Sequence, residues 1–367
     1  MHVLVGLLGA ALIALILAEF FVMIVLPRRV KRSVRLARRV FQLVWIPARG
    51  LGRRLPGRSG DTFLGIFGPL GVLVVLGLWA FGVILGFAAL QWAGGSHVAP
   101  HHTGTFFDDL YFSGGAFLSA AGGVSPQNGF SKVVMLFEAA TGLVLLFIVI
   151  GYLPALYSAF SRREVVVSQL DPRAGSPPSA GALLMRSAER GGWEEVATYL
   201  DEWDNWTAEL METHLSYPVL AYWRSQHVNQ HWLVALTTVV DTSAFAMAAA
   251  PGPAAHAGEL MFAIGRHALA DLAYTFNAKP RPPAADRLPP AVLSELCEEL
   301  MQRDLEIADE EAVRERLDQL RSTYEPYATA LAEHLAVTLP AWMPTDDSQR
   351  NWEEALWQSR RKVRSLP

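Results

Sequence analysis

Cysteine is nearly absent from the chain, which has 367 residues and a single thiol at Cys297. One cysteine excludes a disulfide framework and a zinc module built from several thiolates. Charged side chains are also scarce, at 18% of the residues, whereas apolar ones make up 51%. This balance excludes an ordinary soluble protein and indicates a membrane protein. The scarcity of thiols predicts a reducing cytoplasm for any part that lies in water.

The charges divide the chain into two unlike parts. Residues 1–160 carry 12 basic and five acidic residues, whereas residues 161–367 carry 19 basic and 30 acidic ones. A basic, very apolar part followed by an acidic, mixed part predicts a membrane domain joined to a water-soluble domain.

Three apolar stretches in the first part are long enough to cross a bilayer, which takes roughly 20 residues of helix. They lie at 3–26, 63–92 and 133–160, and the only charges within them are Glu19 and Glu138. The first stretch is too long for a signal peptide and has no basic segment before it, so we expect it to remain as a transmembrane helix.

The loop between the first two stretches holds eleven basic residues within residues 28–61. Lys and Arg accumulate on the cytoplasmic side of membrane proteins, so this loop is predicted to lie in the cytoplasm. The N-terminal helix, residues 1–27, then starts outside a plasma or bacterial inner membrane, and the third stretch returns the chain to the cytoplasm. Membrane orientation and lipid headgroups account for the positive charge, and we expect no nucleic acid partner.

The segment between the second and third stretches is apolar and aromatic but too short to span a bilayer. It reads FFDDLYFSGGAFLS at 106–119, and a glycine-rich turn follows at 119–126. Non-helical backbone at membrane depth is tolerated only where protein buries it or where it lines a water-filled path. A short helix and a glycine-rich turn between two spans therefore predict a re-entrant pore loop.

The pore-loop segment and the stretch after it resemble the pore region of potassium channels, in particular the bacterial channels with two spans per subunit. The resemblance rests on four strings: Leu110–Ser113 (LYFS), Phe117–Pro126 (FLSAAGGVSP), Phe137–Gly142 (FEAATG) and Ile150–Tyr152 (IGY). It implies a channel domain over residues 62–160, with an outer helix at 63–92, a pore helix at 106–119 and an inner helix at 131–160. It also implies a homotetramer in the lipid bilayer that conducts a monovalent cation, which is K⁺ in this family.

The selectivity filter of the family reads T-x-G-Y-G-D, and its backbone carbonyls replace the hydration shell of K⁺. The matching residues of this sequence are Ser119, Ala120, Ala121, Gly122 and Gly123, and the aspartate has no counterpart. Ala121 disfavours the positive φ that glycine accepts, and Gly122 lacks the aromatic ring that braces the filter. The resemblance thus implies an atypical filter, with weaker K⁺ selectivity, a changed shape or no conduction.

Four further residues of the pore region are candidates for function: Asp108, Asp109, Glu138 and Gly142. The two aspartates stand at the N-terminal end of the short helix, where capping is favoured over attraction of cations. Glu138 is an acid within a span and so a functional candidate, or it is an interfacial carboxylate that is hydrogen-bonded behind the loop. Gly142 fits a gating hinge or close helix packing.

The second part of the chain has a helical pattern throughout. A connector rich in Pro, Gly and Ser is expected at 161–181, and an all-helical domain at 182–367. Its expected helices lie at 193–214, 217–250, 256–277, 293–307, 310–335 and 349–366. The stretch 232–250 is long enough for a fourth span, but Asp241 and the hydroxyl side chains around it favour a buried core helix.

No catalytic or metal-binding pattern emerges from the sequence, so we expect neither an enzyme nor a bound cofactor. The phosphate-binding glycine motif of nucleotide-binding domains is absent, and His227 and His231 alone make a weak metal site. Two hypotheses follow. In the first, a cytoplasmic helical domain gates a cation channel by pulling on the third span through residues 158–165. In the second, a non-conducting, channel-like sensor or assembly protein acts through a ligand or protein partner of the helical domain.

Overall fold

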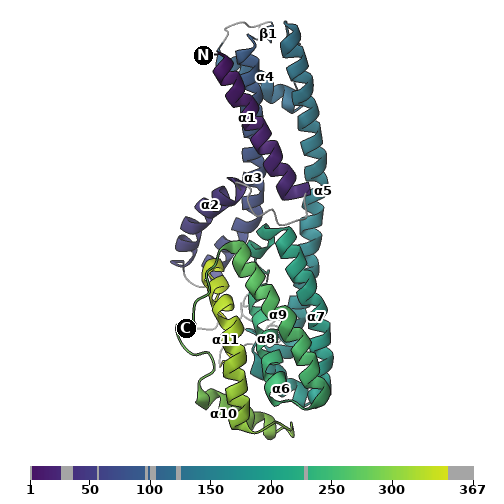
Figure 1. Cartoon of the computed structure of the whole chain (residues 1–367), viewed down its shortest axis with the longest axis vertical. Coiled ribbons are helices and arrows are strands. Elements are labelled where there is room, and N and C mark those ends of the chain that lie inside the picture. Colours follow the sequence, from purple (N-terminus) through teal and green to yellow (C-terminus); the bar gives the residue numbers. More distant parts are fainter. Residues whose placement is uncertain are drawn as a thin grey trace, which may run out of the picture. The chain divides into compact units, whose positions relative to one another are not determined.

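The computed structural model describes residues 2–25, 36–55, 58–95, 98–99, 105–120, 125–226 and 230–345. These residues are almost entirely helical (Figure 1), which confirms the helical class expected from the sequence. They form two compact units. Unit 1 comprises residues 1–48 and 69–158, and unit 2 comprises residues 49–68 and 159–367.

The described part of unit 1 contains three long apolar helices, α1 (His2–Phe20), α3 (Arg58–Ala93) and α5 (Gly129–Ala174), and two shorter ones, α2 (Leu36–Gly52) and α4 (Phe106–Phe117). A π-helical turn (Phe21–Val25) continues α1, and unit 1 includes most of α2, most of α3 and the first part of α5. The strand β1 (Val98–Ala99) pairs antiparallel with β2 (Ser125–Pro126). This pairing joins the connection that follows α3 to the one that precedes α5.

The helix α1 packs closely on α3 because both carry glycines at the contact. A Cβ on Gly9 would lie 2.6 Å from the carbonyl oxygen of Gly86, and such small residues let two membrane helices approach closely. Glu19 is buried in the same unit, and its carboxylate accepts a hydrogen bond of 3.4 Å from the indole N–H of Trp79 on α3. The acid of the first span therefore faces another helix.

Four helices in the described part of the chain are long and apolar enough to cross a membrane: His2–Ile24, Ser59–Ala93, Gly129–Ala174 and Trp232–Ala249. Burial separates the last of them from the others. The most apolar 18 residues of the first three helices are 28%, 39% and 22% buried, respectively, whereas those of the fourth helix are 89% buried. Soluble proteins rarely expose large contiguous apolar surfaces, so the first three helices suit a bilayer and the fourth suits a protein core.

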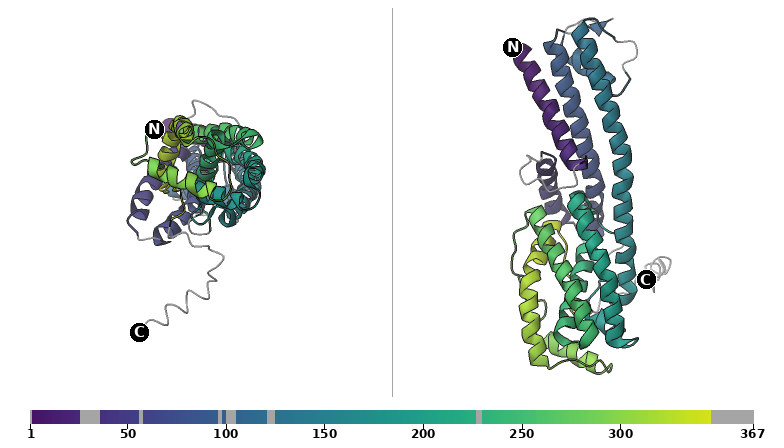
Figure 2. Two further views of the ribbon diagram at one scale, coloured as in Figure 1. Left: turned by 90° about the horizontal axis from the view of Figure 1, so that it is seen from below. Right: turned by 45° about the vertical axis from the view of Figure 1, so that its right-hand side comes forward.

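Unit 2 is a helical bundle built around that fourth helix, α8 (Trp232–Ala249). Its other elements are α6 (Ala180–Ala188), α7 (Gly192–Ser216), a 3₁₀ turn (Pro218–Tyr222), α9 (Gly252–Phe276), α10 (Pro290–Met301) and α11 (Glu310–Leu335), together with the ends of α2, α3 and α5. The helices α7, α9 and α11 pack against α8, whereas α6 and α10 lie together at one end of the bundle (Figures 1 and 2).

A buried network of charged side chains holds α8 in the bundle. The carboxylate of Asp241, which is fully buried, accepts hydrogen bonds of 2.5 Å from the Arg287 guanidinium and 2.5 Å from the Tyr324 hydroxyl. Glu325 accepts hydrogen bonds from Arg287 at 3.0 Å and from Arg321 at 3.1 Å. Buried charges are tolerated when they are paired in this way, so the polar residues that argued against a fourth span have their partners within unit 2.

The helix α5 extends beyond the inner helix expected at 131–160 and reaches Ala174. Its last turns bury Val167 and Leu170 in unit 2, and this apolar face supports a helix where the sequence indicated a connector at 161–181. The connector is correspondingly short.

Other bounds agree with the sequence to different degrees. The bounds expected for α11 are those observed, 310–335. The expected basic loop, 28–61, contains the helix α2. The helix expected at 349–366 lies outside the described residues.

Candidate functional site

The N-terminal end of α4 is fixed by a capping box. The Thr105 hydroxyl accepts a hydrogen bond of 3.4 Å from the Asp108 N–H, and the Asp108 carboxylate accepts one of 3.2 Å from the Thr105 N–H. Asp108 thus has the capping role that the sequence favoured, and Thr105 is the residue that stands at the N-cap. Asp109, the other candidate at this end, is buried in the first turn.

The C-terminal end of α4 closes at Ser119, whose backbone is left-handed with a φ of 55°. The Ser119 N–H donates to the Ala116 carbonyl at 3.0 Å, and the Ala120 N–H donates to the Gly115 carbonyl at 2.7 Å. This is the Schellman pattern, in which glycine is the usual residue at the left-handed position because it carries no Cβ. The helix therefore ends sharply where the expected filter begins.

Three of the five expected filter residues, Ala121, Gly122 and Gly123, lie outside the described residues. The description resumes at Ser125 and Pro126, which pair with β1. The backbone on both sides of the expected filter is therefore held, by the Schellman turn before it and by the strand pairing after it.

The end of α4 rests on Gly142 of α5. A Cβ on Gly142 would collide with the carbonyl oxygen of Phe117, the last residue of α4. Of the two interpretations of Gly142, the structure supports close helix packing. Ser131, Glu138 and Gly142 are seven and four residues apart, so they share one face of α5.

Polar side chains near this face are buried with incomplete hydrogen bonding. Neither carboxylate oxygen of Glu138 has a hydrogen-bond partner among the described residues, and the Ser113 hydroxyl of α4 faces it without completing a bond of normal geometry. Gln91 of α3 donates to the Ser131 carbonyl at 3.2 Å, but its own side-chain oxygen is unpartnered within the described residues. Each unsatisfied buried group costs about 1–3 kcal/mol, so this region favours water or further polar partners.

Asn128 joins the end of α3 to the start of α5. Its amide nitrogen donates to the carbonyls of Gly94 at 3.4 Å and Gly95 at 3.1 Å, and its side-chain oxygen accepts from the Ser131 N–H at 2.7 Å. One side chain thus caps α5 and ties it to α3. The Asn128 bonds join α3 to α5, and α4 meets α5 at the contact between Phe117 and Gly142.

In unit 2, Arg163 anchors the second part of α5. Its guanidinium, only 4% exposed, donates to the carbonyls of Leu220 at 2.9 Å and Trp223 at 2.7 Å, and it lies 3.1 Å from Nε2 of His214. The partners of Arg163 lie more than 50 residues away in the sequence, so no local pattern reveals these buried contacts.

Two histidines of unit 2, His214 and His231, are buried near arginines. Burial, and then the charge of Arg163, lowers the pKa of His214 well below its ordinary value. Burial, and then the charge of Arg224, does the same to the pKa of His231. His227, its expected companion in a weak metal site, lies outside the described residues. Among the residues that are described, no group of three or more His, Cys, Asp or Glu is placed to hold a metal ion.

Two arginines of the expected basic loop contact α11. Arg49 and Arg53 donate to the carbonyl oxygen of Glu333 at 3.1 and 3.0 Å, and Arg224 donates to that of Leu335 at 2.9 Å. Cations at the C-terminus of a helix satisfy its free carbonyls and its dipole. These two arginines therefore have a structural role in addition to the orientation role predicted from their charge.

No protein-family model, curated protein or solved structure matches this chain. The resemblance to potassium channels rests on the residues of the chain itself. Sequence reasoning singled out Asp108, Glu138 and Gly142 but missed Gln91 and Asn128. Asn128 carries a usable signal, since asparagine before an apolar helix is a typical N-cap, whereas Gln91 is recognised only through its contact with α5.

Proposed function

We propose that the chain is one subunit of a pore-loop cation channel of the potassium-channel type, with an atypical filter at residues 119–123. In this proposal four copies surround the pore, because one loop per chain cannot enclose it alone. The helices α1, α3 and α5 lie in a plasma or inner membrane, the N-terminus is outside, and unit 2 is in the cytoplasm.

The observation that carries the proposal is the seating of α4 between two membrane-length helices. With 12 residues, α4 is about 18 Å long, against a hydrocarbon core of about 30 Å, so it cannot cross. Both of its ends are capped, and its last carbonyl meets the backbone of α5 at Gly142. A short helix held this firmly suits the support of a filter segment better than a loose connection between spans.

The buried polar groups beside α4 support a path for water or ions in unit 1. Glu138, Ser113 and Gln91 lie on three different helices, and each has at least one polar atom without a partner among the described residues. Polar groups within a membrane domain are costly and mark ion or proton pathways by default. In this proposal Glu138 lies beside the path, and the filter segment at residues 119–123 coordinates the ion.

Gating by unit 2 is part of the proposal, and α5 supports it. This helix runs without a break from Gly129 to Ala174, so it contributes to both units. Arg163 binds it to the 3₁₀ turn and to α7 inside unit 2. A rearrangement of these elements would act directly on the helix that lines the proposed pore.

Ion flux from liposomes that contain the purified protein tests the proposal, with two glycine variants as a matched pair. Gly142→Ala places a methyl group on the Phe117 carbonyl, whereas Gly151→Ala on the same helix meets no atom within 4 Å. Both changes raise helix propensity by the same amount, about 1 kcal/mol. We expect flux from the wild type and from Gly151→Ala, and loss of most of the flux from Gly142→Ala.

Two outcomes would count against this reading. Equal flux from Gly142→Ala and Gly151→Ala would show that the seat of α4 is irrelevant to conduction. No flux from the wild type in any salt would contradict the channel itself. The second hypothesis, a non-conducting sensor or assembly protein that acts through unit 2, would then become the better one.

A further inference from the structure

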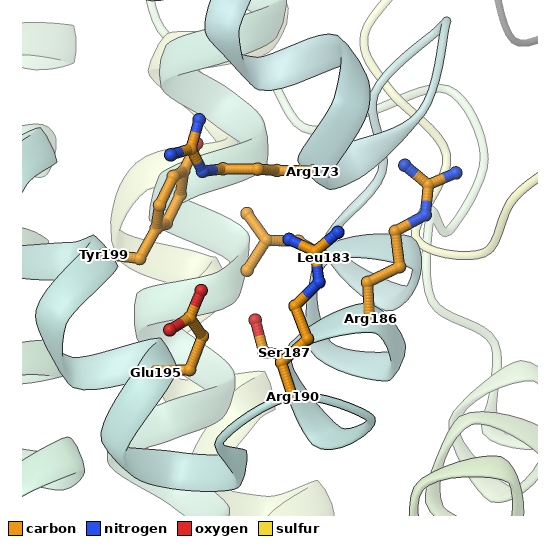
Figure 3. Close-up of a pocket in the computed structure, with 7 residues that line it drawn as sticks. All are labelled: Arg173, Leu183, Arg186, Ser187, Arg190, Glu195 and Tyr199. Carbon is orange, nitrogen blue, oxygen red and sulfur yellow. The ribbon is translucent and has the colours of Figure 1, made fainter.

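The recess drawn in Figure 3 is too small for a ligand. It lies between the end of α5, α6 and the start of α7, and it encloses about 10 Å³. One water molecule needs about that much space. The side chains around it contact one another, since the guanidinium carbon of Arg173 lies 5.6 Å from the centre of the Tyr199 ring. The outer surface of unit 2, by contrast, carries a helix face that no other helix covers in the described structure.

The uncovered face belongs to α9, which runs along the near side of unit 2 between α11 and α7 in Figure 1. The opposite face of α9 packs on α7, α8 and α11, and its Met261, Leu269 and Leu272 are fully buried. The uncovered face, which we call the α9 stripe, consists of His256, Leu260, Ala263, His267, Ala270 and Tyr274. Ala270 is half-buried and the other five are exposed, with 50% of Leu260 and 71% of Tyr274 accessible. Two large apolar side chains of unit 2 therefore face solvent on one helix.

The α9 stripe differs from the outward faces of α7 and α11. The exposed residues of α7 include Glu194, Asp201, Glu202, Glu209 and Glu212. Those of α11 include Glu310, Glu311, Glu315, Arg316, Asp318 and Glu333. The α9 stripe contains no Asp, Glu, Lys or Arg. A helix face in contact with water is normally polar and charged, whereas apolar patches on a surface mark sites of interaction. The α9 stripe therefore suits contact with protein.

The residues of the α9 stripe follow the spacing of a coiled coil. They are alternately four and three residues apart, which is the a/d repeat through which two or more helices pack side by side. With Leu260, His267 and Tyr274 at the a positions, the d positions are His256, Ala263 and Ala270. A polar residue at one a position fixes the register of such helices, and His267 holds that place. The partner that fits this stripe best is a helix with the same repeat, which a second copy of the chain supplies.

Charges beside the α9 stripe complement each other between two parallel copies. In a parallel coiled coil, the g residue of one helix faces the e residue of the following heptad on its partner, and such pairs set the orientation. Arg266 is a g residue, and Asp271 is the e residue of the following heptad. Arg266 is exposed and forms no ion pair with another described residue, whereas Asp271 lies 3.2 Å from Nε2 of His267 on its own helix. Glu259, the other charged g residue, would face Ile264 of the second copy, so no like charges meet.

We propose that α9 forms an interface between copies of this chain, in which the α9 stripe packs in parallel and in register against the α9 stripe of a second copy. Arg266 of each copy then pairs with Asp271 of the next. The parallel direction rests on the proposed function, because copies inserted in one membrane orientation are related by rotation about the membrane normal. In the proposed tetramer, four α9 helices would surround the same axis as the pore.

Disulfide crosslinking of the full-length protein in liposomes tests this interface. The background is Cys297→Ala, which removes the native thiol. Leu260→Cys and Ala263→Cys each place a thiol at an a or d position, where identical residues of two parallel helices face each other. The matched control is Met301→Cys on α10, because Met301 is 51% exposed and Leu260 is 50% exposed. At a low ratio of protein to lipid, oxidation should yield a covalent dimer from both stripe variants and leave Met301→Cys monomeric on a non-reducing gel.

Charge reversal in the Leu260→Cys variant tests the pair between copies. Arg266→Glu places a carboxylate beside Asp271 of the second copy, and it should lower the crosslinked fraction about threefold. Adding Asp271→Arg restores opposite charges and should restore most of the crosslinking. A general loss of stability would give no such rescue, because the second change also removes the contact of Asp271 with His267.

The interface is overturned if neither stripe variant crosslinks more than Met301→Cys, in protein that remains folded by circular dichroism. Loss of crosslinking in Arg266→Glu without rescue by Asp271→Arg would overturn the charged pair and the parallel register with it. Ion flux from the same liposomes keeps the interface apart from the channel. Crosslinking without flux would contradict the channel and support the interface, whereas flux without crosslinking would do the reverse.

Discussion

Removing Arg287 is expected to destabilise unit 2 far more than removing an arginine from its surface. The Arg287 guanidinium is 10% exposed and pairs with Asp241, which is fully buried, at 2.5 Å and with Glu325 at 3.0 Å. Arg287→Met keeps the apolar stem but leaves a carboxylate of α8 without its cation. Breaking a buried pair from one side costs about 3–5 kcal/mol, so we expect a loss of that size in the free energy of unfolding.

The assay is urea unfolding of the purified protein in detergent, followed by tryptophan fluorescence. Arg281→Met is the matched control, because Arg281 and Glu333 form an ion pair whose side chains are 64% and 51% exposed. Such surface pairs contribute about 1 kcal/mol or less. The double variant Asp241→Leu with Arg287→Met should be more stable than Arg287→Met alone, since it removes the buried charge together with its partner. Equal losses for Arg287→Met and Arg281→Met would refute the reasoning.

Three further predictions concern the end of α4, the contact between α1 and α3, and the effect of pH on stability. Ser119→Gly should stabilise unit 1 by about 1 kcal/mol, since glycine relieves the left-handed strain at the end of α4; thermal unfolding in detergent measures this, and a lower melting temperature would contradict it. A double variant, Gly6→Cys with Ala93→Cys, in a chain whose native cysteine is removed, should form a disulfide upon oxidation. The reason is that a Cβ on Gly6 would lie 2.9 Å from the Cβ of Ala93. No shift in mobility on a non-reducing gel would contradict the packing of α1 on α3. The free energy of unfolding should fall as the pH drops below about 6.5, because histidines of the unfolded chain then bind protons whereas the buried His214 and His231 stay neutral. His214→Gln should make this fall smaller between about pH 7.5 and 5.5. An unchanged slope would contradict the prediction.

Local patterns in the sequence predict the elements whose stability is local. The bounds of α11 follow from an apolar stripe after Asp309, whose carboxylate caps the helix at the Ala312 N–H. The short helix 106–119 follows from its length and from the acids in its first turn, and it is observed as α4. Both depend on residues within a few positions of each other, which is where propensity and capping operate.

Long-range contacts decide what the sequence left open or missed. Gly142 fitted a hinge or close packing, and only the position of Phe117 separates the two. Asp241 argued against a fourth span through its polarity, but its partners Arg287 and Tyr324 lie 46 and 83 residues away. Contacts of this kind arise from packing, so spacing along the chain carries no signal for them.

The flux of K⁺, Na⁺ and a larger organic cation through the wild-type protein in liposomes is the most direct test of the central claim. We expect cation flux, with less discrimination between K⁺ and Na⁺ than potassium channels show, because Ala121 and Gly122 stand where the family has its first filter glycine and its tyrosine. A preference for K⁺ over both other cations would still support the channel, with a filter that coordinates the dehydrated ion. No flux of any of the three, from protein shown to be folded and inserted, would contradict it.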